Sequence, residues 1–169
     1  AGPADKIKSG NMADFLAEAE AVAIKAAKEA GKVALKHFRK STSEIKGGNV
    51  RDVVTNADKE ADSLIRSIIA QKFPDHAIVT EEDKPKEGNE FCWHIDPIDG
   101  TVNYSRGETY FCVAIGLAKM DELMVGVIYR PTTGELYMAA KGKGAFLNGK
   151  PIRVASTNKL EQAILCRDF

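Results

Sequence analysis

The chain has few residues of the kinds that build zinc sites or disulfide networks. It contains three cysteines and three histidines among 169 residues, and no pair of cysteines has the CxxC spacing. An odd number of cysteines without that spacing argues against a disulfide framework and against a zinc cage. We therefore expect Cys92, Cys112 and Cys166 to be the reduced thiols of a cytoplasmic protein.

The chain also lacks an excess of either charge and lacks long apolar runs. Lys plus Arg and Asp plus Glu number 24 each, so the formal net charge is zero. Proteins that bind nucleic acid by broad charge attraction are usually basic, so we expect no nucleic-acid partner. No apolar stretch approaches the roughly 20 residues of a membrane-spanning helix, so we expect no membrane partner. Residues 1–10 do not follow the pattern of a secretion signal, and we expect a disordered tail or tag remnant there, followed by one domain over residues 11–169.

Two segments near the start of the chain have helical periodicity. Apolar residues recur every three or four positions from Asn11 to Lys40 and again from about Asn56 to Lys72, which predicts two amphipathic helices. Thr55, with Asp58 three residues later, matches a helix-capping pair. Pro74 is expected to end the second helix, because proline cannot continue the backbone hydrogen bonding.

The rest of the chain has the pattern of short strands and hairpins. Strands are predicted at residues 77–80, 91–95, 110–117, 123–129 and 135–139, and a hairpin at residues 146–152. Helices followed by a run of hairpin-connected strands are typical of an α+β protein. We expect two N-terminal helices packed on a mainly antiparallel sheet.

Acidic residues stand at the ends of three predicted elements. Glu81 and Glu82 follow one strand, Asp96 and Asp99 follow the next, and Asp58 opens the second helix. Strands that end at one edge of a sheet would bring the first two groups together, and carboxylates that close repel unless a cation neutralises them. Oxygen ligands alone favour Mg2+, Mn2+ or Ca2+ over zinc.

Each acidic group also has a simpler interpretation when it is taken alone. Asp58 could be a helix cap only, Glu81–Asp83 a solvated turn, and Asp96-x-x-Asp99-Gly100 a turn that uses Asp and Gly for their backbone preferences. The pattern does not match an EF-hand loop. The three groups together favour a metal site, and backbone N–H groups after Asp99 suit a phosphate.

The run from Asp96 to Tyr104 resembles the central motif of the inositol monophosphatase family, the Mg2+-dependent and lithium-sensitive phosphatases. Residues 52–58 resemble the Asp-x-Val-Thr-x-x-Asp segment of that family, and Glu81–Glu82 resembles its Glu pair. Residues 142–149 resemble its Gly-x-Gly-Ala-x-x-Asn-Gly hairpin, and the likeness extends from about residue 14 to about residue 155.

The resemblance implies roles for several residues in phosphate-monoester hydrolysis. Metal ligands would be Glu81, Asp96, Asp99 and the backbone carbonyl of Ile98, with Mg2+ as the cofactor and Mn2+ as the alternative. The phosphate would lie against Asp99, Gly100 and Thr101, and the attacking water would be oriented by Asp58, Thr101 and Glu81. Lys46 could help to hold phosphate or could be an exposed loop residue.

The resemblance also implies a substrate class and a partner. The substrate would be a small phosphate monoester, with inositol monophosphate favoured and the sister activities on fructose bisphosphate, 3′-phosphoadenosine nucleotides or histidinol phosphate as alternatives. Family members are often homodimers. A competing interpretation is a metal-binding or interaction module without turnover.

One departure from the family pattern concerns a tryptophan. The second half of the family carries a Trp-Asp motif whose Asp is a further metal ligand, whereas Trp93 is the sole tryptophan here and precedes His94. We therefore expect the first half of the layered αβαβα sugar-phosphatase fold, with little or no activity alone. Such a half would leave an apolar face exposed.

Overall fold

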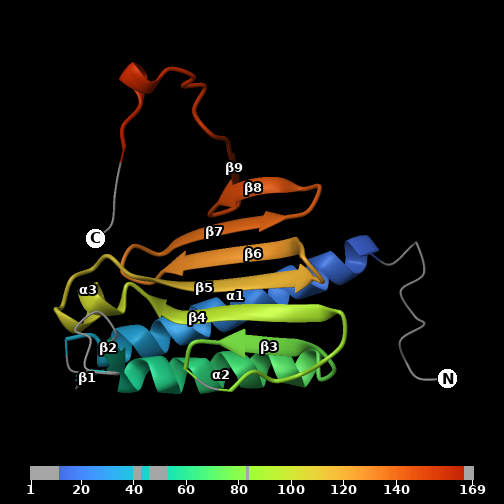
Figure 1. Cartoon of the computed structure of the whole chain (residues 1–169), viewed down its shortest axis with the longest axis vertical. Helices are drawn as coiled ribbons and strands as arrows, with labels where there is room; N and C mark the ends of the chain where they lie inside the picture. The colour runs from blue at the N-terminus through green and yellow to red at the C-terminus, as the bar shows by residue number, and fades with distance from the viewer. Residues whose placement is uncertain (1–11, 40–42, 46–52, 83, 166–169) are drawn as a thin grey trace.

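The structure is a computed structural model that describes residues 12–39, 43–45, 53–82 and 84–165 (Figure 1). Lys46, Asp52, Asp83 and the side chain of Thr55 lie outside the described part, as do residues 1–10. The expectations that rest on those positions therefore stay predictions. Within the described residues, no helix is both long enough and apolar enough to cross a membrane.

Both predicted helices are present with nearly the predicted bounds. Helix α1 spans Met12–His37 and helix α2 spans Asn56–Lys72. The buried face of α1 carries small side chains, mainly alanines (Ala19, Ala23, Ala26, Ala27, Ala30 and Ala34). A Cβ atom at Gly31 would lie 2.6 Å from the ring of Tyr129 on the sheet. Because glycine lacks a side chain, α1 can pack closely against Tyr129.

The strands form one seven-stranded sheet and one small hairpin. The sheet has the order β3-β4-β5-β6-β7-β8-β9; β3 and β4 are parallel, and every other neighbouring pair is antiparallel. The bounds are β3 Ala77–Thr80, β4 Phe91–Asp99, β5 Cys112–Lys119, β6 Glu122–Arg130, β7 Glu135–Ala140, β8 Gly144–Leu147 and β9 Lys150–Ile152. Strands β1 Ser43–Ile45 and β2 Val53–Thr55 pair with each other, and the short helices are α3 Thr101–Ser105 and the 3-10 turn Leu160–Gln162.

The α+β fold is the one expected from the sequence, but some strand ends differ. Strand β4 continues to Asp99 instead of ending at Ile95, because its last residues pair with β5. Strand β5 begins at Cys112 instead of Tyr110, and β8 begins at Gly144 instead of Phe146. Asp96 therefore lies within a strand, whereas the sequence predicted a turn.

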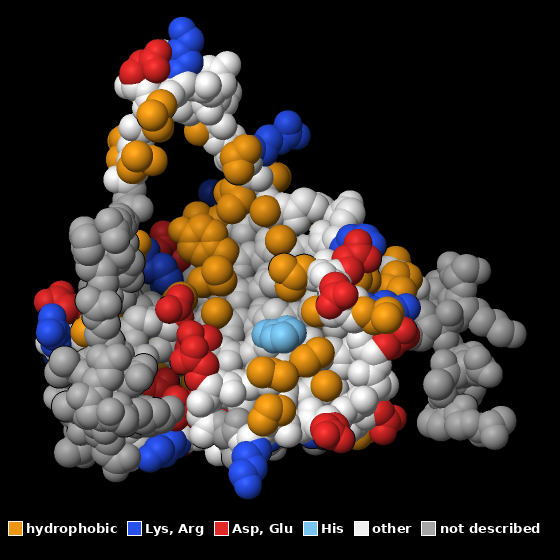
Figure 2. All heavy atoms as spheres, viewed as in Figure 1, with side chains coloured by type: hydrophobic (Ala, Val, Ile, Leu, Met, Phe, Trp, Pro, Cys, Tyr) orange, Lys and Arg blue, Asp and Glu red, His pale blue; other side chains and the backbone are white. Residues whose placement is uncertain are grey.

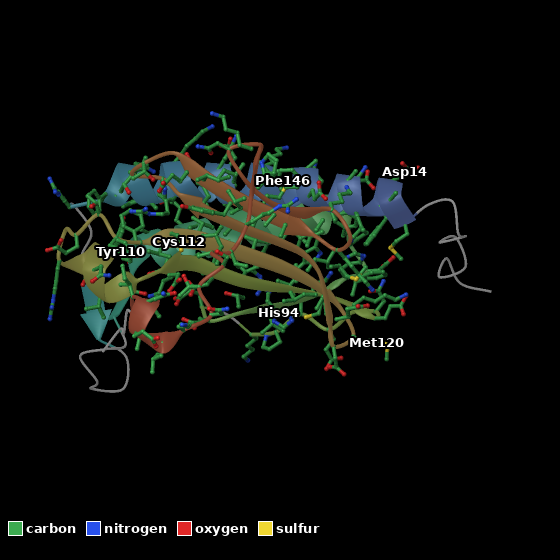
Figure 3. All side chains as sticks on the ribbon, turned by 90° about the horizontal axis from the view of Figure 1, so that it is seen from above. Asp14, His94, Tyr110, Cys112, Met120 and Phe146 are labelled. Atoms are coloured by element: carbon green, nitrogen blue, oxygen red, sulfur yellow. The ribbon has the colours of Figure 1, made fainter. Side chains whose placement is uncertain are left out.

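The helices cover one face of the sheet and leave the other face open. Helices α1 and α2 lie behind the sheet in Figure 1 and enclose a core with the inward side chains of the central strands, which include Trp93, Ile115 and Leu117. The outer face has an open hollow of about 590 Å3. Figure 2 shows hydrophobic side chains gathered over that face, and Figure 3 shows His94 on the side of the sheet away from α1.

Candidate active site

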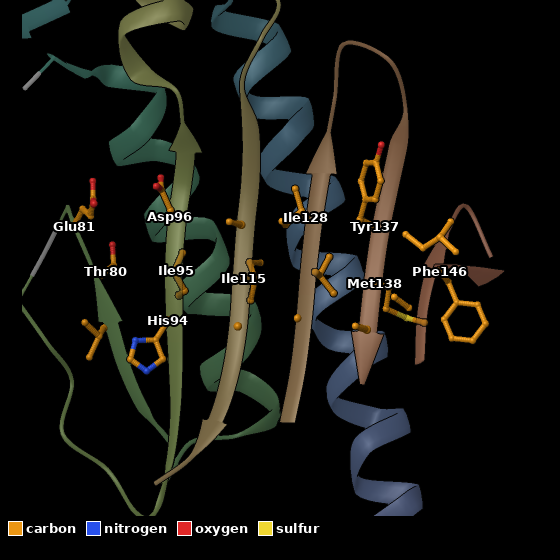
Figure 4. Close-up of a pocket in the computed structure, with 18 residues that line it drawn as sticks. Thr80, Glu81, His94, Ile95, Asp96, Ile115, Ile128, Tyr137, Met138 and Phe146 are labelled. Atoms are coloured by element: carbon orange, nitrogen blue, oxygen red, sulfur yellow. The ribbon is translucent and has the colours of Figure 1, made fainter. Parts of the chain in front are cut away.

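The first part of the site lies where β3 ends beside β4. These strands are parallel, and Thr80 is paired with Ile95. Glu81 and Asp96 are therefore the next residues along the two neighbouring strands, at the same edge of the sheet. Both line the outer hollow, and Figure 4 shows their carboxylates at the same end of it.

A β-bulge in β4 brings a third carboxylate to this face. Asp96 is opposite Ala114, and Asp99 is opposite Cys112, so three steps along β4 match two steps along β5. In a regular strand, residues three apart would point to opposite faces of the sheet. The extra residue places Asp96 and Asp99 on the same face, and Pro97 within the bulge has no N–H group to lose from the ladder.

The carboxylates are close enough to affect one another strongly. The pKa of Asp96 is raised from 3.8 to about 7, first by burial and then by the negative charges of Glu81 and Asp99. Glu82 adds a smaller effect in the same direction, and a hydrogen bond with the backbone of Ile98 opposes the rise. Negative charge therefore accumulates at this edge of the sheet, and a cation would relieve it.

The donor set at this edge fits a hard divalent cation better than a soft one. The ligands predicted from the resemblance are carboxylates together with the carbonyl oxygen of Ile98, and Mg2+ and Mn2+ favour such oxygen ligands. Among the described residues, no three His, Cys, Asp or Glu side chains already converge as a metal cage. The carboxylates lie at the same edge of the sheet and affect one another electrostatically. Glu81 and Asp99 are exposed, so their side chains can change rotamer.

The segment after Asp99 forms a tight turn into α3. Gly100 has φ +91°, in the left-handed region, and a Cβ atom there would lie 2.9 Å from the carbonyl oxygen of Tyr110. Glycine is therefore required both by the backbone angle and by the close approach. The hydroxyl of Thr101 donates a hydrogen bond to the carbonyl oxygen of Ile98 at 3.1 Å, which ties the first residue of α3 to the bulge.

Helix α3 is anchored to the helical layer behind the sheet. The Tyr104 hydroxyl donates to the carbonyl oxygen of Ala34 on α1 at 2.7 Å. Ala57 at the start of α2 is buried in one small cluster with Ile98 and Tyr104. Asp58, the next residue of α2, is 2% exposed and has a polar partner. The predicted site residue Asp58 thus follows Ala57, which packs against Ile98 of the bulge. The Thr101 hydroxyl is hydrogen-bonded to the carbonyl oxygen of Ile98.

Three residues near the site were not predicted from the sequence. Thr80 donates to the buried carboxylate of Asp62 on α2, and the Cys112 thiol donates to Oδ2 of Asp99 at 3.5 Å. Asp62 could have been noticed, because it is an acidic residue among the mainly apolar buried positions of α2, as Asp58 is. Nothing in the sequence pairs Cys112 with Asp99, because that contact depends on the register of β4 and β5.

Comparison with known proteins identifies the family to which this arrangement belongs. A sequence model of the inositol monophosphatase family matches residues 16–169. The chain belongs to the inositol monophosphatase family. The resemblance noted in the central motif therefore extends over nearly the whole chain.

Individual members of the family show the same likeness. The chain is 39% identical to inositol monophosphatase 3 of Solanum lycopersicum, over 95% of this chain and 60% of the relative. It is 41% identical to a fructose-1,6-bisphosphatase/inositol-1-monophosphatase of Aquifex aeolicus, over 82% of this chain and 53% of the relative. The solved structure of an IMPase/NADP phosphatase with Mg2+ and phosphate superposes with a TM-score of 0.79 at 28% identity, over 88% of this chain and 57% of that one. The chain thus spans a little more than half the length of these family members.

Proposed function

We propose that this chain supplies the metal and phosphate end of an enzyme that hydrolyses a small phosphate monoester, with inositol monophosphate as the favoured substrate. The observation that carries the proposal is the β4 bulge, which puts Asp96 and Asp99 on one face beside Glu81. The same bulge leads directly into Gly100 and α3. Metal ligands and phosphate donors would thus be neighbours along one short segment.

The metal would be held by Glu81, Asp96, Asp99 and the carbonyl oxygen of Ile98. We propose Mg2+ as the ion, with Mn2+ as the alternative. A divalent ion supplies positive charge to the phosphoryl oxygens and a Lewis acid for water activation. The raised pKa of Asp96 supports this assignment: burial raises it first, and the charges of Glu81 and Asp99, which a cation would offset, raise it further.

The remaining residues would bind the phosphate and orient the water. The backbone N–H groups of Gly100 and Thr101 would donate to the phosphoryl oxygens. Asp58, the Thr101 hydroxyl and Glu81 would orient the attacking water by hydrogen bonds. The water would then lie in line with the bond that breaks. Phosphoryl transfer depends mainly on such positioning and charge stabilisation, since there is little covalent chemistry for side chains to perform.

A second substrate class is favoured by one relative. The Aquifex aeolicus protein carries both fructose-1,6-bisphosphatase and inositol-1-monophosphatase in its name. We therefore propose fructose bisphosphate as the alternative substrate of the complete protein. A homodimeric state and a cytoplasmic location stay predictions from the sequence.

The test is Mg2+-dependent release of phosphate from inositol 1-phosphate by this chain, with fructose 1,6-bisphosphate assayed in parallel. Asp99→Asn should abolish release, whereas Asp121→Asn should not, because Asp121 lies in the β5–β6 turn. Mg2+-independent release, or release that survives Asp99→Asn, would contradict the proposal. Mn2+ binding without turnover would mean that these residues hold the ion but do not suffice for hydrolysis.

A further inference from the structure

A buried carboxylate on α2 lies beneath the acidic edge of the sheet. Asp62 is 3% exposed, and the other buried positions of α2 are mostly apolar or alanine, including Ala61, Ile65 and Ile69. Burial of a charged side chain is costly unless hydrogen bonds compensate for the lost water. The role of Asp62 is therefore to be found in what it binds.

Asp62 binds the last residue of strand β3. The Thr80 hydroxyl donates a hydrogen bond to Asp62 Oδ1 at 2.6 Å. A distance this short is typical of a hydroxyl that donates to an ionised carboxylate, which is about twice as strong as a neutral hydrogen bond. The contact joins residues 18 positions apart and fixes the end of β3 to α2.

The same hydroxyl also holds the turn that follows. The backbone N–H of Glu82 donates to Thr80 Oγ1 at 3.1 Å, which closes a Ser/Thr turn around Glu81. A hydroxyl has one proton to donate and lone pairs that accept. Thr80 can therefore donate to Asp62 and accept from Glu82 at the same time. The chain Asp62–Thr80–Glu82 therefore sets the backbone of the turn from which the Glu81 side chain projects.

Glu81 depends on this backbone because its side chain is not held by packing. It is exposed to solvent, whereas Asp96 is half-buried in β4. Glu81 and Asp96 nevertheless line the same end of the outer hollow (Figure 4). The main chain of the turn therefore sets the point from which the exposed Glu81 side chain reaches the hollow.

We propose that Asp62 and Thr80 are positioning residues: they fix the Thr80–Glu82 turn and thereby set the Glu81 carboxylate beside Asp96. The consequence for metal binding rests on the proposed function, whereas the fixing of the turn does not. Outer partners of this kind usually change metal affinity about 10- to 100-fold when they are removed. Neither residue would touch the substrate.

The first measurement tests the turn without any metal. Thr80→Val removes the hydroxyl at nearly constant shape, Thr80→Ser restores it, and Thr157→Val is the control at an exposed threonine. By NMR, the Glu82 amide should exchange about tenfold faster in Thr80→Val, and the order parameters at Glu81 and Glu82 should fall. Thr80→Ser and Thr157→Val should match the parent chain. Unchanged protection in Thr80→Val would overturn the proposal.

The second measurement tests the consequence for the metal. Mn2+ binding, followed by the electron paramagnetic resonance of the unbound ion, should weaken about tenfold or more in Thr80→Val and should recover in Thr80→Ser. Asp62→Asn keeps an acceptor for Thr80 and removes a charge, so it should weaken binding less than Thr80→Val. The opposite order would assign Asp62 a purely electrostatic effect and overturn its positioning role. A parent chain that binds no Mn2+ would contradict the proposed function, and the amide measurement would still decide the positioning.

Discussion

The indole N–H of Trp93 donates a hydrogen bond to Nδ1 of His76 at 3.0 Å, and both side chains are buried. This bond requires an unprotonated Nδ1, and the imidazole is stacked between the rings of Phe73 and Phe91 at 4.7 and 4.9 Å. The pKa of His76 is lowered from 6.5 to about 4, first by burial and then by the nearby charge of Lys86. His76 is therefore a neutral core residue at neutral pH.

His76 should make the fold sensitive to acid. Between pH 6.5 and about pH 4, the unfolded chain binds a proton at this histidine and the folded chain does not. The contribution of His76 to the free energy of unfolding should therefore fall as the pH falls through this window, by roughly 3 kcal/mol in total for a shift of this size. Urea unfolding at pH 7, 6, 5 and 4 measures the change.

Asp96 acts in the opposite sense, so a variant is needed to isolate His76. The folded chain holds a proton at Asp96 more tightly than the unfolded chain does, which favours folding below pH 7. His76→Asn keeps an acceptor for Trp93 and removes the titration, so the free energy of unfolding of the parent should fall relative to that of His76→Asn as the pH falls from 6.5 to about 4. Parallel curves for the parent and His76→Asn would contradict the prediction.

The carboxyl group of Asp96 should titrate near neutral pH in the metal-free chain. Its pKa of about 7 depends on burial and, next, on Glu81. Glu81→Gln should therefore lower the midpoint, because it removes the neighbouring charge that acts most strongly on Asp96, while Asp121→Asn should not move it. Carboxyl 13C NMR measures these midpoints directly. Added Mg2+ should also lower the midpoint, and a midpoint near 4 in the metal-free parent would show that the carboxylates lie further apart.

Sequence periodicity was sufficient to predict the helices and most strands, because the local alternation of apolar and polar residues determines which face of each element is buried. The predicted end of β4 was wrong for a physical reason. Asp96-Pro97-Ile98-Asp99-Gly100 contains the residues that favour turns. Pairing with β5, more than a dozen residues later, nevertheless extends the strand and absorbs the extra residue as a bulge.

The sequence proposes the candidate site as a set of residues and not as a geometry. The sequence places carboxylates at strand ends, which is enough to suggest a cation site. It does not show that Asp96 and Asp99 share a face, since that requires the bulge. Nor does it show that Thr80 bonds to Asp62, because that contact depends on how α2 packs beneath β3.

Cys112 should be an unreactive thiol as long as Asp99 is charged. Burial, followed by the charge of Asp99 and the hydrogen bond to it, raises the pKa of Cys112 from 9.0 to about 12. The thiolate is the reactive form, and its fraction at pH 8 should be about a thousandfold lower than usual. Labelling of Cys112 by iodoacetamide, followed by peptide mass spectrometry, should be at least roughly tenfold slower in the folded chain than in urea.

Asp99 provides the control for that measurement. Asp99→Asn removes both the charge and the carboxylate acceptor, so Cys112 should react faster than in the parent chain. Asp121→Asn should leave the rate unchanged. Equal rates in the parent and Asp99→Asn would mean that burial alone protects the thiol, and that the contact with Asp99 Oδ2 is not maintained in solution.

Gly100→Ala should destabilise the turn between the bulge and α3. The added methyl group would occupy a backbone with φ +91° and would lie 2.9 Å from the carbonyl oxygen of Tyr110. The left-handed backbone angle alone costs a non-glycine residue about 1–3 kcal/mol, and the close contact adds to that cost. Gly134→Ala is a matched control, since Gly134 has φ +72° but open space around its Cβ position. Urea unfolding should show a larger loss of stability for Gly100→Ala than for Gly134→Ala. Equal losses would mean that only the backbone angle, and not the approach of Tyr110, requires glycine at the start of α3.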